Sequence, residues 1–317
     1  MVFFLFYELE LIMKLGRLDL LTGILVTVIW GCNFSVIELG LKSLDPFVLT
    51  LLRFTFCAIP LVFFMKKPDN VSYASLATYG VLFGVGLWWV VNFAMYSGLS
   101  AGMSSVFLQF SAFFTIIMSR IFLAEAINKV HGVGIFLSIS GLLMILYYSE
   151  ETSTISGILL VLLAAFSWSL CNLIVKMKKP ADMVAFIVWS SLFSVPAIFV
   201  MTLLFEGVKP FQSLVSDFSW GAGFSIFFQC YITTIFGYKT WNNLMKKYPA
   251  SAVAPLSLIV PLAGILTSYL FFNEHLSTAQ FVAITVVFVG IAVFINSSRI
   301  LTTWEKLAKQ KARPTLT

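Results

Sequence analysis

Long apolar runs separated by short polar segments dominate the pattern along the chain. Ten runs approach the roughly 20 residues that a membrane-spanning helix needs. They cover about residues 20–39, 46–65, 75–97, 102–123, 132–148, 155–175, 183–205, 218–238, 251–273 and 276–296. Runs such as 281–295 do not alternate between apolar and polar residues, as the strands of a membrane β-barrel do. The pattern therefore predicts an all-α polytopic membrane protein with ten transmembrane helices.

The second half of the chain resembles the first. When segment 101–147 is aligned with segment 250–296, eight of 47 positions are identical. The identical pairs are Ala101 and Ala250, Ile116 and Ile265, Ser119 and Ser268, Phe122 and Phe271, Glu125 and Glu274, Val133 and Val282, Ile135 and Ile284, and Gly141 and Gly290. Each of the two glutamates closes one apolar run and opens the next.

This match predicts two five-helix repeats, at residues 18–148 and 154–296, followed by a basic cytoplasmic tail at 297–317. A repeat that crosses the membrane an odd number of times leaves its second copy in the opposite orientation. Inverted repeats of this kind are typical of secondary transporters.

Composition excludes a sizeable soluble domain, because 60% of the residues are apolar and only 11% are charged. Residues 1–12 are also apolar, but they are too short to span a membrane and are interrupted by Glu8 and Glu10. They lack the basic start and the cleavage site of a secretory signal. We interpret Met13 as the native start, and residues 1–12 as an extension.

Cysteine and histidine supply no candidate chemistry. The four cysteines, Cys32, Cys57, Cys171 and Cys230, are dispersed within apolar runs, and no pair has the spacing of a metal site or a redox motif. The two histidines, at 131 and 275, lie at run ends. We therefore predict no metal, no cofactor and no enzyme activity.

Basic residues indicate the orientation. With the N-terminus in the cytoplasm, sixteen of the twenty lysines and arginines fall on cytoplasmic segments, and the outer loops hold only Lys42 and Lys209. Basic residues in short loops set topology, so both termini are predicted to be cytoplasmic. The basic tail, Trp304 to Arg313, suits contact with anionic lipid rather than nucleic acid. The oligomeric state stays open.

Polar residues inside the runs are the candidate substrate site, since such residues tend to face the bundle interior or a water-filled cavity. Several lie three or four apart, on one face of a helix. The candidates are Trp30, Asn33, Arg53, Trp88, Asn92, Ser105, Gln109, Trp168, Asn172, Gln229 and Ser257. Amides and hydroxyls also join membrane helices by hydrogen bonds worth about 0.6 kcal/mol on average, which is the alternative interpretation.

Four residues are candidates for charge pairing or movement. Arg53 lies inside the second run, where a charge should be paired or functional, and either Glu38 or a substrate carboxylate is its expected partner. Pro255 and Pro261 interrupt the ninth run and permit a bend there, for which the fourth run has no counterpart. We expect Glu38 and the two prolines to act in gating.

Several segments resemble the drug/metabolite transporter superfamily, and its EamA-type amino-acid-metabolite efflux branch most closely. These are 30–34 (WGCNF), 52–54 (LRF), 109–115 (QFSAFFT), 166–168 (FSW) and the fourteen residues 248–261 (YPASAVAPLSLIVP), ending at Asn273-Glu274. The resemblance implies ten helices in two inverted repeats around a central cavity. It also implies export of amino acids or related metabolites across the bacterial inner membrane. Glu38 stands where relatives typically carry lysine.

The leading hypothesis is a secondary transporter that exports small amino acids or related metabolites by alternating access. Export of aromatic compounds or drugs is the alternative for the same fold, because tryptophans line the expected cavity. A channel is the alternative from another class, although no charged ring or filter-like loop is visible. An enzyme would need a cluster of reactive groups, and a receptor would need a larger loop or domain.

Overall fold

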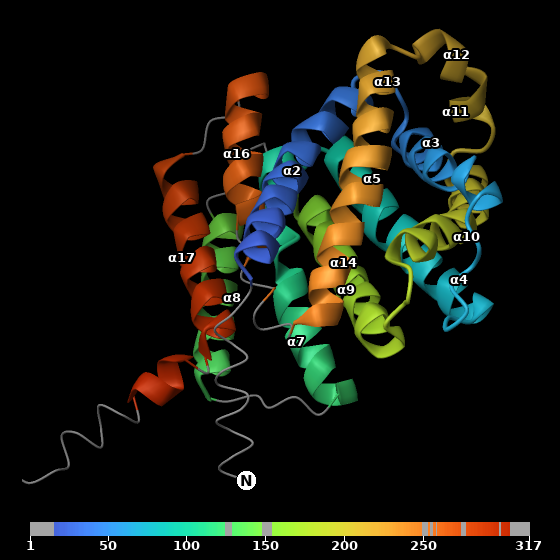
Figure 1. Cartoon of the computed structure of the whole chain (residues 1–317). Helices are drawn as coiled ribbons and strands as arrows, with labels where there is room; N and C mark the ends of the chain where they lie inside the picture. Colours follow the sequence, from blue (N-terminus) through green and yellow to red (C-terminus); the bar gives the residue numbers. More distant parts are fainter. Residues whose placement is uncertain are drawn as a thin grey trace, which may run out of the picture. The chain divides into compact units, whose positions relative to one another are not determined.

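The computed structural model describes residues 16–123, 129–147, 154–248, 253, 256–257, 259–273, 277–297 and 299–304. Residues 1–12, the two repeat glutamates Glu125 and Glu274, the candidate hinge Pro255 and most of the predicted tail lie outside these residues. Within the described part of the chain, every regular element is helical (Figure 1). The prediction of an all-α protein is confirmed for these residues.

The elements follow the predicted runs. The first half contains α2 (Arg17–Leu41), α3 (Pro46–Ala58), η1 (Leu61–Phe63), α4 (Tyr73–Val81), η2 (Leu82–Trp89), α5 (Val90–Tyr96), α6 (Ala101–Phe107), α7 (Phe110–Leu123) and α8 (Lys129–Tyr147). The second half contains α9 (Ile155–Lys178), α10 (Met183–Phe205), α11 (Lys209–Gln212), α12 (Leu214–Asp217), α13 (Trp220–Phe227), η3 (Phe228–Tyr238), α14 (Lys239–Lys247), α16 (Ile259–Phe272) and α17 (Thr278–Ile295). Of these, η2 and η3 are π-helical.

Six helical segments in the described residues are long and apolar enough to cross a membrane, which makes this a multi-pass membrane protein. They are Arg17–Leu41, Pro46–Phe63, Tyr73–Tyr96, Ala101–Leu123, Ile155–Lys178 and Met183–Phe205. Shorter apolar helices occupy three of the other predicted runs, at Gly132–Gly141, Ile259–Phe272 and Phe281–Phe294. The count of ten spans remains a prediction.

The eighth predicted run differs from the structure at its end. The run was expected to stop at 238, but the helix continues through α14 to Lys247. The reason is that α14 is amphipathic: Trp241, Leu244 and Met245 are buried, whereas Lys239 is exposed. A hydropathy pattern ends where charges begin, and a packed helix does not.

Polar caps fix the starts of several helices. The Asp45 carboxylate accepts hydrogen bonds from the amides of Phe47 (2.8 Å) and Val48 (3.4 Å), and Pro46 follows it at the first helical position. Burial raises the pKa of this carboxyl, and the two amide bonds act in the opposite direction. Hydroxyls cap four further helices in the same way, those of Ser72, Ser100, Thr154 and Ser219.

Helix bounds recur in the alignment that pairs segment 101–147 with segment 250–296. In that register the first residues of α7 and α16 are equivalent, and so are their last residues. The first residues of α8 and α17 are equivalent as well. Extended toward the N-terminus, the same register pairs Trp89 with Tyr238, where the two π-helical segments end. Wide helical turns therefore occupy equivalent places in the third and eighth predicted spans.

The expected difference between the fourth and ninth spans stays a prediction, because Pro255 lies outside the described residues. The fourth span is itself interrupted at Leu108 and Gln109, between α6 and α7. Pro261 lies in the first turn of α16, which begins at Ile259. A proline in the first turn removes no intrahelical hydrogen bond, so it requires no bend within α16.

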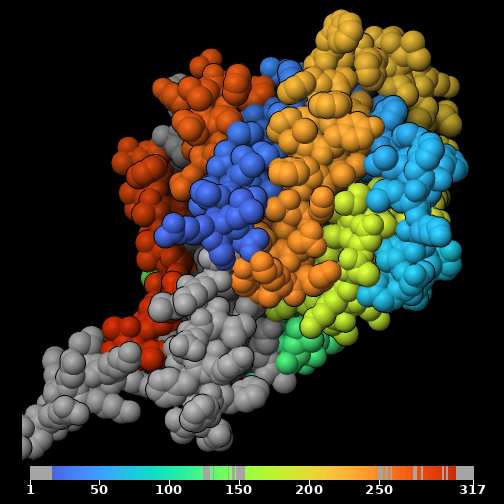
Figure 2. Space-filling model, in the orientation of Figure 1, coloured from blue at the N-terminus to red at the C-terminus, as the bar shows by residue number. Residues whose placement is uncertain are grey.

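The described chain forms two compact units. The larger comprises residues 1–118 and 150–275, and in it α2 packs against α16, α13, η3 and α14. Figure 2 shows the surface of α2 (blue) between α16 (red-orange) and the α13–η3–α14 helix (orange). At the start of α2, the Asp19 carboxylate accepts hydrogen bonds from Lys247 and Tyr248, each at 2.6 Å. Elsewhere in this unit, α10 packs on α3 and α4.

The smaller unit comprises residues 119–149 and 276–317, and its two long helices, α8 and α17, pack closely. The Ser138 hydroxyl donates to the carbonyl of Val287 at 3.2 Å. Gly134 and Gly141 allow this approach: a Cβ at Gly134 would lie 2.5 Å from the backbone nitrogen of Phe294. Small residues let membrane helices approach in this way.

We expect Gly134→Ala to destabilise the α8–α17 pair by about 1–3 kcal/mol, the usual cost of overfilling a packed contact. The obstacle is backbone, which cannot rotate away. The measurement is the apparent melting temperature of the purified protein in detergent. Gly132→Ala on the same helix is the matched control, since a Cβ there meets no atom within 4 Å. Equal melting temperatures for the two variants would contradict the packing.

Candidate functional site

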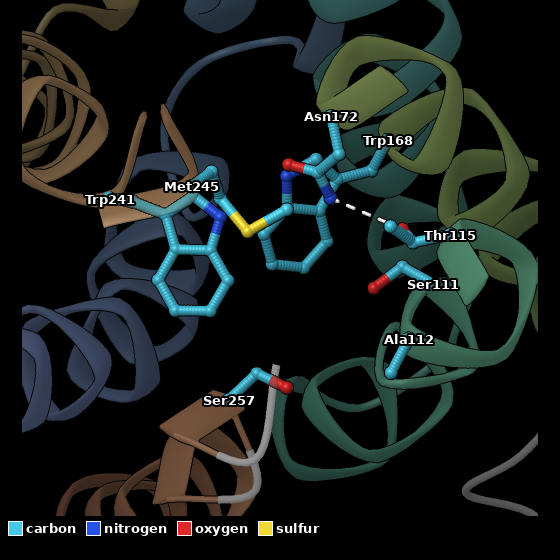
Figure 3. A pocket seen from close by; sticks show the side chains of 8 residues that line it. All are labelled: Ser111, Ala112, Thr115, Trp168, Asn172, Trp241, Met245 and Ser257. Carbon is cyan, nitrogen blue, oxygen red and sulfur yellow. Dashed lines mark hydrogen bonds between the residues drawn. The ribbon is translucent and has the colours of Figure 1, made fainter. Parts of the chain in front are cut away.

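A small pocket in the larger unit is the candidate functional site. The empty space between its walls, counted together with the open solvent at its mouth, is about 270 Å³. Its walls come from α7, α9, α14 and the turn before α16, and the lining residues are Ser111, Ala112, Thr115, Trp168, Asn172, Trp241, Met245 and Ser257 (Figure 3).

The pocket wall combines apolar surface with neutral hydrogen-bonding groups. The Asn172 amide donates to the Thr115 hydroxyl at 3.3 Å, the bond that Figure 3 draws as a dashed line. The buried indole nitrogen of Trp241 has no hydrogen-bond partner among the residues that the structure describes. The eight lining residues include no Asp, Glu, Lys or Arg. Such a wall can hold a small, mostly apolar molecule and orient it by a few hydrogen bonds.

An aromatic cluster lies directly behind the pocket. The Trp30 ring packs 5.6 Å from Trp168, 5.2 Å from Trp241 and 4.6 Å from Tyr238, as measured between ring centroids. Its indole nitrogen donates to the carbonyl of Thr233 at 3.1 Å. Trp30 is therefore buried behind the tryptophans of the pocket and does not line it.

A second buried group surrounds Arg53 on α3. The guanidinium donates to the Thr234 hydroxyl at 3.0 and 2.8 Å and to the Gln229 carbonyl oxygen at 3.3 Å. It also lies over the Trp88 ring, 4.0 Å from the centroid. Trp88 in turn donates from its indole nitrogen to the Tyr238 hydroxyl at 3.1 Å. Arg53 thus meets side chains of both π-helical segments.

The Glu38–Arg53 pair stays a prediction, and the described hydrogen bonds of Arg53 go to other groups. Within the described part of the chain, the guanidinium donates only to Gln229 and Thr234 on η3. Glu38 is half-buried on α2. The side chain of Arg53 faces η2 and η3, so neutral groups on η3 reach it first.

The remaining candidates are buried but do not line the pocket. Asn33 is fully buried, and in the described part of the chain neither end of its carboxamide has a hydrogen-bond partner. Asn92 donates to the Thr50 hydroxyl at 2.8 Å, and no described residue donates to its carboxamide oxygen. Ser105 and Gln109 bond to carbonyls of their own helical turns. Of the predicted substrate-binding residues, the pocket thus brings together Trp168, Asn172 and Ser257.

Sequence reasoning missed Ser111, Thr115, Trp241 and Met245. The first two lie four apart, on one helical face, and a search for neutral hydroxyl pairs would have found them. Trp241 and Met245 have the same spacing, but they lie beyond Lys239, and the predicted apolar run ends just before that charged residue. The extension of the helix into α14 brings both to the pocket.

Comparisons with known proteins agree with this architecture. The model of the EamA-like transporter family matches residues 18–147 and again 155–296. The "Probable amino-acid metabolite efflux pump" of Escherichia coli is 31% identical over 302 residues, which is 93% of this chain and 99% of that protein. The protein of the same description from Salmonella typhimurium is 31% identical over 90% of this chain and 97% of its own length.

A solved structure shares the fold. A crystal structure at 16% sequence identity superposes with a TM-score of 0.63 and covers 89% of this chain and 98% of that chain. This likeness concerns the fold alone. The double match of the family model and the 31% identity over nearly the whole chain decide the family. The protein belongs to the EamA-like transporter family, within the drug/metabolite transporter superfamily.

Proposed function

We propose that this transporter exports small amino acids or related metabolites across the bacterial inner membrane. The observation that carries the proposal is the pocket, whose wall pairs two indoles with neutral amide and hydroxyl groups and includes no charged side chain. The printed names of the Escherichia coli and Salmonella relatives support the same class of cargo. A zwitterion without net charge fits such a wall better than a phosphorylated solute or a bare ion.

The proposed mechanism is alternating access between two inverted five-helix repeats, with both termini in the cytoplasm. The family model matches the chain twice, and the bounds of α7 recur at α16 when the two halves are aligned. The pocket takes residues from both halves, Thr115 and Trp241 among them. A site built from both repeats can open to either side when one repeat rocks against the other.

Transport by reconstituted vesicles tests this function. Vesicles that contain the purified protein should exchange labelled neutral amino acids, and Asn172→Ala should lower the rate at limiting substrate about tenfold, the equivalent of one lost hydrogen bond of about 1.4 kcal/mol. The matched control is Asn243→Ala, on the exposed face of α14. Unchanged transport by Asn172→Ala would contradict the assignment of the pocket.

An aromatic cargo is the second candidate, favoured by the tryptophans at 168 and 241. Binding of an aromatic cargo should depend on the Trp241 ring more than binding of a small amino acid does. Trp241→Ala should weaken competition by aromatic solutes more than competition by alanine, because only an aromatic solute loses a stacking partner. Equal losses would favour the small amino acid. Single-channel conductance in a planar bilayer would instead indicate a channel.

A further inference from the structure

Arg53 is a fully buried charge whose surroundings are neutral. Its side chain is 0% exposed. Three of the five N–H groups that a guanidinium carries are used, all in bonds to Thr234 and Gln229. In the described residues no carboxylate bonds to this guanidinium. A buried charge in a membrane protein without a counter-ion marks a place for a charged ligand.

A second buried group lies one helical turn away. Thr50 and Arg53 are three residues apart on α3, while Trp88 and Asn92 are four apart on η2 and α5. Arg53 lies over Trp88, and Asn92 donates to Thr50, so the two helices meet in two successive contacts along one face. The carboxamide oxygen of Asn92 is buried and has no hydrogen-bond partner within the described ranges. This face of the two helices thus presents the Arg53 guanidinium and, about one helical turn further along, the Asn92 carboxamide oxygen as a hydrogen-bond acceptor.

The groups that now hold the guanidinium can be replaced. Gln229 and Thr234 are neutral, and both belong to the π-helical segment η3. Each has a further bond within its own helix: the Gln229 amide donates to Ser225 at 2.9 Å, and the Thr234 hydroxyl donates to the Gln229 backbone carbonyl at 2.7 Å. A carboxylate makes two parallel, charge-assisted bonds with arginine, and these are stronger than bonds to a neutral amide or hydroxyl.

We propose that Arg53 and Asn92 bind the charged head of an α-amino acid. The carboxylate of the substrate bonds to the guanidinium and displaces Gln229, while the ammonium group donates to the Asn92 carboxamide oxygen. Trp88, whose ring lies under the guanidinium, contacts the α-carbon. This inference rests on the proposed function and narrows it, because it requires both a free carboxylate and a free ammonium group on the cargo.

This site is distinct from the pocket in Figure 3. The aromatic cluster lies between the two: Trp88 bonds to Tyr238, Tyr238 packs on Trp30, and Trp30 packs on the pocket tryptophan Trp168. The pocket wall is largely apolar and suits the side chain of an amino acid, whereas the Arg53 face suits its charged head group. An amino acid that moves from the pocket to the Arg53 face has to pass the aromatic cluster, so the rings of that cluster must separate.

Competition in reconstituted vesicles tests the head-group site. Uptake of labelled leucine is measured against unlabelled leucine, its methyl ester, which lacks the carboxylate, and N-acetyl-leucine, which lacks the ammonium group. In the wild type, each derivative should compete at least tenfold less well than leucine. Arg53→Gln should abolish the penalty for the ester and keep that for the acetyl derivative. Asn92→Leu should do the reverse.

For each variant, the result is the ratio between the competing strength of a derivative and that of leucine. This ratio separates recognition from folding, because it does not depend on how much of the protein is active. Arg53→Lys keeps the charge without the planar fork, so it should retain part of the ester penalty and serves if Arg53→Gln does not fold. Arg120→Gln, at an exposed arginine, and Asn243→Leu are the matched controls and should keep both penalties.

Two outcomes would overturn the site. One is a wild type that accepts the methyl ester as well as leucine; the other is an ester penalty that Arg53→Gln and Arg53→Lys leave unchanged. Both leave amino-acid export itself standing. A wild type that transports no amino acid would overturn the proposed function, and the head-group site with it.

Discussion

Trp30→Ala is expected to destabilise the protein by about 3–5 kcal/mol, the range for removing a large buried aromatic side chain. Trp30 is 3% exposed and contacts the rings of Trp168, Tyr238 and Trp241. Removing it leaves a cavity at the centre of the cluster and frees the Thr233 carbonyl. The measurement is the apparent melting temperature in detergent, together with transport in vesicles, both of which should fall.

Two variants calibrate that result. Trp220→Ala removes the same side chain where it is 95% exposed, and should leave the melting temperature almost unchanged. Trp30→Phe keeps much of the ring packing but loses the bond to Thr233, so it should cost about 1 kcal/mol for the hydrogen bond alone, in addition to a smaller packing loss. If Trp30→Ala were no less stable than Trp220→Ala, the cluster would not hold the helices together.

Gly31→Val is expected to cost about 3 kcal/mol, the upper part of the range for overfilling a packed core. A Cβ at Gly31 would meet the backbone oxygen of Val260, and would lie 2.5 Å from the Ala263 Cβ and 2.9 Å from the Gly264 nitrogen. Two of these three obstacles are backbone, so α2 and α16 would have to separate. Scanning calorimetry or fluorescence in detergent measures the loss.

Gly223→Val is the control for this contact. A Cβ at Gly223 meets only the ring of Phe218, at 3.5 Å, which is ordinary contact with a side chain. The control variant should therefore lose far less stability. Similar melting temperatures for Gly31→Val and Gly223→Val would mean that the close approach of α2 to α16 does not support the fold.

The sequence alone predicts most of the helices, because the signal for a membrane helix is a sum over about 20 residues. The run at 183–205 coincides with α10, and the start of the run at 155 coincides with α9. The prediction fails where charged residues lower the hydropathy summed over such a window. The predicted run ends at 238 and leaves out α14, because the few buried apolar residues on one face of this charged helix contribute little to the average hydropathy.

The sequence predicts which residues are buried better than it predicts which side chains contact each other. The burial of Asn33, Asn92 and Gln109 follows from their place in apolar runs. The partner of Arg53 did not follow, because charge favours Glu38, whereas the structure supplies Gln229 and Thr234. Spacing defines one face of one helix. It does not say which other helix that face meets.

By itself the sequence determined the membrane class, the helical fold, the family resemblance and the recurrence of segment 101–147 at 250–296. These depend on composition and on order along the chain. Only the tertiary structure decided that Trp241 and Met245 reach the pocket, that Trp30 lies behind it, and that Arg53 lies over Trp88 among neutral partners. These depend on contacts between residues far apart in the chain, which are set by how helices pack, and no local pattern records that.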